Sequence, residues 1–173
     1  MSRHVPLSAS VPALVAFGCS GCQPSTTPTA SDVPADTTHS VNTKTADALR
    51  EALMDERRAY AFYTSVMSKH GQVRPFSNIV NAEVRHAAVI ESLMTRHGID
   101  IPNQTPTNLP AVPSTLAECS RLAASLEREN IAMYDRLLVE VTQPDIRAAF
   151  QNLRDASKNN HLPAFERWAG TGG

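Results

Sequence analysis

The amino-acid sequence predicts an all-α fold, and three observations support this prediction. Apolar residues recur at three- and four-residue spacing through most of residues 45–168, as in helices with one buried face. Leu, Ala, Arg and Glu dominate this part of the chain, and no alternation of Val, Ile and Thr is sustained. The chain has 173 residues, of which 42% are hydrophobic, enough for one ordinary core. We therefore expect one helical domain over residues 44–170.

Breaks in the apolar pattern divide this domain into four helices. Gly71 and Gly98 each follow a basic residue and a histidine, and each is placed to end a helix. Thr115 and Glu118 form a capping-box pattern that begins another. The last helix opens at TQPDIRAAF, and we expect it to bend at Pro163. The predicted helices span residues 45–70, 75–97, 115–141 and 143–168.

The connections between these helices predict how they are arranged. Residues 99–113 contain four prolines and cannot form a helix, so they make a long crossover between the second and third helices. Short loops join the other two pairs. This order of connections is that of a ferritin-like four-helix bundle. Such bundles hold two metal ions with one Glu from each of two helices and a Glu-x-x-His pair from each of the other two.

A carboxylate lies where an apolar residue is expected in the second helix. Glu83 is in the middle of the apolar face, and an ionised carboxylate there is costly to bury without a partner. His86 follows one turn later on nearly the same face. The first helix presents Glu56 on a face shared with two leucines and two tyrosines: Leu49, Leu53, Tyr60 and Tyr63. We expect Glu56, Glu83 and His86 to converge in the core.

The second half of the domain repeats the first. Tyr63 follows Glu56 by seven residues in DERRAYAFY, and Tyr134 follows Glu127 by seven in LERENIAMY. This spacing favours Glu127 over Glu129 as the matching carboxylate. Both tyrosines fit as packing residues, and their hydroxyls also fit as hydrogen-bond donors to the opposing glutamates.

A histidine completes the repeat. His161 follows Glu127 by 34 residues, whereas His86 follows Glu56 by 30. The difference is about one helical turn, which a loop can absorb.

One position departs from the pattern of such sites. A second Glu-x-x-His pair would require glutamate at position 158, where this chain has Lys158, and Ser157 offers only a neutral oxygen. A lysine removes a carboxylate and adds a repulsive charge beside the metal ions. We therefore expect the half-site of Glu56, Glu83 and His86 to bind metal more strongly than the half-site of Glu127 and His161.

Residues 45–168 resemble the ferritin-like superfamily. The segments PFSNIVNAEVRHAAVIESL and NNHLPAF are similar to a bacterial and archaeal family of ferritin-like domains of unknown function. The resemblance implies two iron or manganese ions between four helices, with ferroxidase, peroxidase or oxygen chemistry. It implies five metal ligands: Glu56, Glu83, His86, Glu127 and His161. Mixed carboxylate and imidazole ligation suits iron, although manganese and zinc accept the same ligands.

The alternative is a metal-free bundle that acts as a binding or structural module. In it, Lys158 and the histidines neutralise the three glutamates as a buried polar network. His70 and His97 lie in the last turns of their helices and are not expected to be ligands. Cys119, the only cysteine of the domain, lies on an apolar face and is expected to be a small core residue.

The N-terminal segment predicts a lipoprotein leader. Residues 1–18 combine Arg3, a weakly apolar run and small residues just before Cys19, which is therefore the expected lipidation site in preference to Cys22. Residues 19–43 are rich in Thr, Ser and Pro and predict a flexible tether. We therefore expect a lipid-anchored protein of the cell envelope, on the extracytoplasmic side of a membrane.

The net charge and the predicted membrane anchor also limit which partners we expect. The formal net charge of −1 gives no electrostatic footprint for nucleic acid. A membrane tether argues against a closed storage cage, while dimerisation through a helix face is left open.

Overall fold

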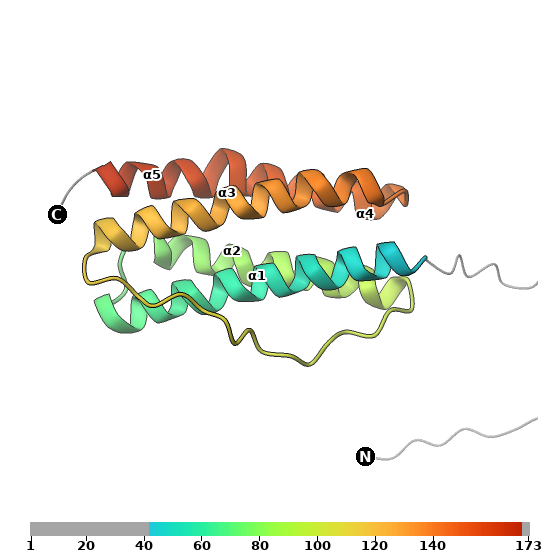
Figure 1. The fold of residues 1–173 in the computed structure, drawn as a ribbon, viewed down its shortest axis with the longest axis horizontal. Coiled ribbons are helices and arrows are strands. Elements are labelled where there is room, and N and C mark those ends of the chain that lie inside the picture. The colour runs from blue at the N-terminus through green and yellow to red at the C-terminus, as the bar shows by residue number, and fades with distance from the viewer. Residues whose placement is uncertain (1–41, 171–173) are drawn as a thin grey trace, which may run out of the picture. The chain divides into compact units, whose positions relative to one another are not determined.

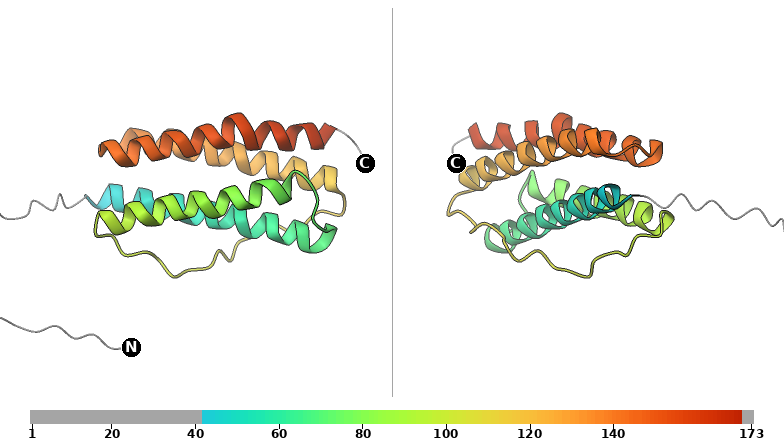
Figure 2. Two further views of the ribbon diagram at one scale, coloured as in Figure 1. Left: turned by 180° about the vertical axis from the view of Figure 1, so that it is seen from behind. Right: turned by 45° about the vertical axis from the view of Figure 1, so that its right-hand side comes forward.

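The computed structural model describes residues 42–170, which form an all-α four-helix bundle and confirm the predicted fold class (Figure 1). The helices are α1 (Thr43–His70), α2 (Phe76–Arg96), α3 (Leu116–Glu140) and α4 (Pro144–Ala156), the last continued by a π-helical turn, η1 (Ser157–His161), and by α5 (Leu162–Gly170). Two helical hairpins lie against each other, one made of α1 and α2 and the other of α3 and α4 to α5 (Figure 2). The predicted leader and nearly all of the predicted tether lie outside the described residues.

The helix ends are where local chemistry places them. Asn42 caps α1 by accepting a hydrogen bond from the Thr45 amide at 2.9 Å, so this helix begins two residues earlier than predicted. Gly71 and Gly98 have positive φ angles of 85° and 64°, which other residues rarely adopt. The capping box at Thr115 is present, and it confirms the predicted start of α3.

The crossover between α2 and α3 lies along α1 (Figure 1). Arg57 donates a hydrogen bond to the carbonyl of Pro102 at 2.6 Å, and Lys69 donates one to the carbonyl of Val112 at 3.0 Å. These two side chains, three turns apart on α1, hold the crossover along the helix. As a result, α3 begins at the end of the bundle where α1 ends (Figure 1).

The last helix departs from α-helical geometry one turn before the predicted bend. Pro163 has no amide hydrogen and cannot donate to the preceding turn, which is why a bend is expected there. The chain instead widens at η1, where the Leu162 amide donates to the carbonyl of Ser157, five residues earlier. Ser157 and His161 are buried as a result, whereas the three residues between them are exposed.

A polar layer divides the apolar core into two parts. Along each helix, buried apolar residues stop before the layer and resume after it. On one side lie residues of the cluster that includes Leu49, Ile90, Leu137 and Phe150, and on the other those of the cluster that includes Phe62, Phe76, Cys119 and Phe165. The buried polar residues between them are Glu56, Glu83, Glu127, Asn130, Ser157 and His161. Cys119 is fully buried, as predicted.

No helix within residues 42–170 combines the length and the apolar character that crossing a bilayer needs.

Candidate metal centre

Glu83 lies at the centre of the polar layer and faces two histidines. Its Oε2 is 3.3 Å from Nδ1 of His86, one turn along α2, and its Oε1 is 3.1 Å from Nδ1 of His161 in η1. The residue is only 2% exposed. Each carboxylate oxygen of Glu83 is therefore directed at a different imidazole.

Each of these imidazoles also faces a second glutamate. His86 Nδ1 is 3.2 Å from Oε2 of Glu56 on α1, and His161 Nδ1 is 3.5 Å from Oε1 of Glu127 on α3. The two imidazole rings are stacked, with centroids 5.3 Å apart and planes at 18°. The structure thus brings the five residues of the predicted ligand set into one cluster, with Glu83 shared by two halves.

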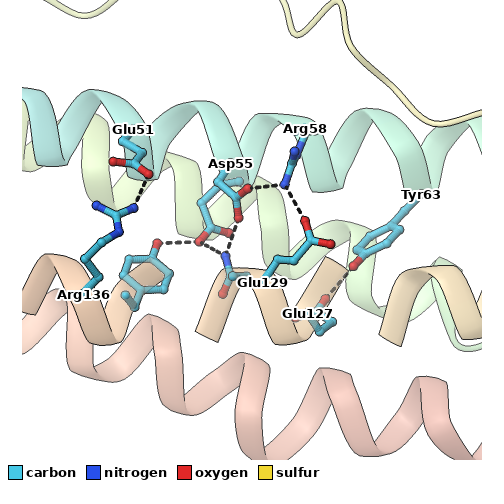
Figure 3. Close-up of polar contacts among 10 residues, drawn as sticks. Glu51, Asp55, Arg58, Tyr63, Glu127, Glu129 and Arg136 are labelled. Carbon is cyan, nitrogen blue, oxygen red and sulfur yellow. Dashed lines mark hydrogen bonds and ion pairs between the residues drawn. The ribbon is translucent and has the colours of Figure 1, made fainter. Parts of the chain in front are cut away.

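Two tyrosines hold the outer glutamates in place across the bundle. Tyr63 on α1 donates a hydrogen bond to Oε1 of Glu127 at 2.6 Å (Figure 3), and Tyr134 on α3 donates one to Oε1 of Glu56 at 2.5 Å. Burial, together with the neighbouring carboxylates, raises the pKa of both tyrosine hydroxyls well above the usual 10. Both hydroxyls therefore remain protonated and act as donors.

The cluster contains buried atoms without hydrogen-bond partners. Glu83 Oε1 and His161 Nδ1 make no hydrogen bond within residues 42–170, although they lie 3.1 Å apart. Such atoms are costly to bury unless something else satisfies them. Two ligand atoms ~2.1 Å from one ion, at a right angle, are themselves ~3.0 Å apart. The 3.1 to 3.5 Å separations in the cluster are therefore compatible with ligand atoms that share a metal ion.

The charges in the cluster are strongly coupled. Burial raises the pKa of the Glu56 carboxyl. Burial also opposes ionisation of Glu83, but its contacts with His161 and His86 outweigh this effect, so the pKa of Glu83 is lowered. Desolvation disfavours charged imidazoles, yet the facing carboxylates raise the pKa of His86 to about 9 and that of His161 to about 10. Without metal, both imidazoles are therefore protonated at neutral pH.

Lys158 does not join the cluster, contrary to the expectation from sequence. Its side chain is exposed, and it makes no hydrogen bond or ion pair with any residue of the described bundle. The physical reason is the π turn, which directs Ser157 rather than Lys158 toward the core. The charge that compensates Glu83 comes instead from the two imidazoles.

Sequence reasoning missed Asn130 and Asp55. Asn130 is 6% exposed, and its Nδ2 donates hydrogen bonds to Oδ2 of Asp55 at 2.9 Å and to Oε1 of Glu56 at 3.4 Å. The available signal was spacing, because Asn130 lies three residues after Glu127 and four before Tyr134, on the same face of α3. Asp55 gave no such signal, since it lies beside the apolar face of α1 rather than on it.

Three other residues on or near the predicted faces lie away from the cluster. Tyr60, expected on the face of Glu56, is 43% exposed. His70 contacts the carbonyl of Pro113 at 3.1 Å, and His97 contacts Oδ2 of Asp145 at 2.9 Å. Neither histidine is positioned as a ligand of the cluster, in line with the prediction.

Fold and site together define an all-α four-helix bundle with a buried cluster of carboxylates and imidazoles that could hold a metal. The chain belongs to the family described as "Uncharacterized protein domain (DUF2202)", which matches residues 46–173. A crystal structure of a hypothetical protein from Methanococcus jannaschii DSM 2661 is similar, with a TM-score of 0.67 and 20% identity over 75% of this chain and 81% of that chain. This likeness shows a shared fold. A comparison with curated proteins finds no match.

Proposed function

We propose that the protein binds divalent metal ions in the bundle core, one on each side of Glu83. The observation that carries this proposal is that the two oxygens of Glu83 face the Nδ1 atoms of different imidazoles, His86 and His161. Glu56 and Glu127 would be the outer ligands of the two half-sites. Glu83 would be the bridge between them.

Iron is the metal that we propose for this centre. The ligand set is three carboxylates and two imidazoles, a mixture that suits iron and that manganese and zinc also accept. The only cysteine of the described chain, Cys119, lies in an apolar part of the core and adds no thiolate.

The chemistry that we propose is oxidation of Fe(II) or reduction of peroxide. Bound iron would supply one electron per ion to peroxide or dioxygen. The protein's own residues hold and orient the centre: the tyrosines fix the carboxylates of Glu56 and Glu127, and the imidazoles carry protons until metal displaces them. The three glutamates are at most 3% exposed, so bulk water is excluded from the cluster. Peroxide reduction would require an external reductant, because no cysteine pair for electron transfer lies in the described bundle.

We also propose that the protein acts in the cell envelope, held to a membrane by a lipid on Cys19. The support is the leader sequence, in which small residues precede this cysteine after a weakly apolar run. The flexible composition of the tether would let the bundle stand away from the membrane surface.

The competing explanation is a metal-free bundle in which the protonated imidazoles of His86 and His161 neutralise the glutamates. The raised pKa values of both imidazoles agree with it. Glu83 Oε1 and His161 Nδ1 form an ion pair at 3.1 Å but make no hydrogen bond, and this favours metal instead, since a complete polar network would satisfy both atoms with hydrogen bonds.

The test is metal binding by the full chain, with matched variants on one helix. Metal-free protein is loaded anaerobically with Fe(II), its metal content is measured, and its absorption spectrum is recorded before and after exposure to air. We expect up to two ions per chain and a new absorption band on oxidation. Glu83→Gln should abolish binding. Glu91→Gln should preserve it, because Glu91 lies on the same helix but pairs with Arg57 near the surface. Equal metal content in the two variants would refute the proposal.

A further inference from the structure

Two cavities lie between α1 and α3, one open to solvent and one beside the metal cluster. The outer cavity, of about 680 Å³, lies under the crossover and is lined by residues that include Glu51, Glu129 and the segment 104–108. The inner cavity, of about 10 Å³, has roughly the volume that one water molecule needs. Its lining includes Tyr63, Glu83, Glu127 and Asn130. Asp55 and Arg58 line both cavities, so they form the wall between them.

Two residues that line the inner cavity carry a buried oxygen atom without a hydrogen bond. Asn130 is 6% exposed, and its Oδ1 makes no hydrogen bond within residues 42–170, although its Nδ2 donates to Asp55 and Glu56. Glu83, which lines the same cavity, has an Oε1 that makes no hydrogen bond, although it lies 3.1 Å from Nδ1 of His161. Amide and carboxylate oxygens are ligands that hard divalent cations take, often with water completing the shell.

Carboxylates lead from solvent past Asp55, which lines both cavities, to the candidate metal centre in order of decreasing exposure. The side chain of Glu129 is 59% exposed, that of Asp55 is 15% exposed and that of Glu56 is 1% exposed. Asp55 projects from α1 and Glu129 from α3, and Arg58 lies between their carboxylates (Figure 3). A positive ion moving inward is therefore never far from a negative charge.

Arg58 lies between the two outer carboxylates of this series. Its Nη2 is 2.8 Å from Oδ1 of Asp55 and 3.7 Å from Oε2 of Glu129, and its side chain is 35% exposed (Figure 3). The ion pair with the exposed Glu129 is worth only ~1 kcal/mol or less. The pair with Asp55, which is largely buried, can open when an incoming cation takes over the compensation of that carboxylate.

We propose that Asp55, with Glu129 and Asn130 Oδ1, forms a transit site through which a divalent cation reaches the metal centre, and that Arg58 covers this site until the cation displaces it. The inference rests on the proposed function, since it names the route by which that centre is loaded. The occupant is a cation rather than a neutral oxidant, because carboxylates and an unpaired amide oxygen line the route. Exchange of one positive group for another keeps the buried carboxylates compensated throughout.

The experiment measures the rate at which Co(II) binds to the full chain, with visible absorption recorded in a stopped-flow instrument. Association and dissociation rates, the equilibrium Kd and the dependence on salt are measured for Asp55→Asn and Arg58→Ala. Matched controls are Asp135→Asn and Arg128→Ala, because these residues also form ion pairs but lie at the contacts of α3 with α4 and α5.

A transit site changes both rates and leaves the affinity alone. We expect Asp55→Asn to slow association and dissociation by roughly tenfold each and to weaken the salt dependence of association. Arg58→Ala should speed both by about fivefold, the factor that corresponds to ~1 kcal/mol. The controls should match the unaltered protein.

Several results would overturn the inference and leave the metal centre standing. One is Co(II) binding at unchanged rates in Asp55→Asn. Another is a change in Kd without a change in association rate, which would make Asp55 only a support for Glu56 through Asn130. A third is unchanged Co(II) loading with slower oxidation of preloaded Fe(II) by peroxide, which would make the route one for the oxidant. Absence of Co(II), Fe(II) and Mn(II) binding in every protein, the unaltered chain included, would refute the proposed function itself.

Discussion

Raising the pH should destabilise the metal-free protein, and metal should abolish that dependence. The facing carboxylates raise the pKa of His86 from 6.5 to about 9 and that of His161 from 6.5 to about 10. A raised pKa means that the folded state holds protons that the unfolded chain has lost. The stabilising effect of these protons is complete below pH 6.5, falls as the pH rises from there, and is gone above the folded-state pKa values of about 9 and about 10.

The size of the effect follows from the number of protons. Between about pH 7 and pH 9 the folded state holds up to two more protons than the unfolded chain, so the free energy of unfolding should fall by up to ~2.7 kcal/mol per pH unit. A metal ion must displace these protons to bind. Its affinity should therefore rise by up to about tenfold per pH unit at each half-site. With saturating metal, the rise in metal affinity with pH cancels the loss of the stabilising protons, so the free energy of unfolding should hardly change with pH.

The assay is urea unfolding followed by circular dichroism between pH 6.5 and 8.5, with chelator or with excess Mn(II). His86→Gln removes one of the two protons and should halve the slope of the metal-free protein. The matched control is His97→Gln, because His97 is about as buried as His86 but pairs with Asp145 outside the cluster. A metal-free stability that does not change with pH would show that the imidazoles are not protonated. An equal pH dependence of the free energy of unfolding with and without metal would show that metal does not bind the imidazoles.

Three further predictions concern the asymmetry of the centre and its anchoring. Glu83→Gln should remove both ions, whereas Glu127→Gln should remove one and leave the other, as measured by metal content per chain. Ser157→Glu should tighten metal binding at the weaker half-site by roughly tenfold or more, because it places a carboxylate at a buried position. Lys158→Glu should leave the Kd unchanged, because that side chain is exposed. Tighter binding in Lys158→Glu than in Ser157→Glu would refute the role given to the π turn. Cys19→Ser should move the protein from the membrane fraction to the soluble fraction of cells, and an unchanged distribution would count against the lipid anchor.

Much of the fold was predictable because its determinants are local. The apolar spacing, the glycines at 71 and 98 and the capping box at Thr115 act over a few residues, and the helices that they predict agree with the structure to within about two residues at their ends. The prolines of residues 99–113 likewise made the long crossover predictable, since proline excludes a helix without reference to the rest of the chain.

The main residues of the candidate centre were also predictable. Glu56, Glu83 and Glu127 interrupt apolar faces at matched places, and burial of an isolated carboxylate is too costly to be accidental. The pairing of Tyr63 and Tyr134 with the opposing glutamates followed from the repeat between the two hairpins. Asn130 was not recognised, because an asparagine on a helical face carries no charge that demands an explanation.

By itself, the sequence determined which helices form, the order in which they connect and which glutamates and histidines turn inward, because hydrophobic period and turn chemistry act locally. Tertiary structure alone decided that Ser157 rather than Lys158 is buried in the core. In the π turn, the backbone amide donates to the carbonyl five residues earlier instead of four. Whether the chain forms this turn depends on how the buried residues His161 and Phe165 pack against the other helices. It also decided that Asp55, Arg58 and Asn130 meet between α1 and α3, since contacts between residues 75 positions apart depend on how whole helices lie side by side.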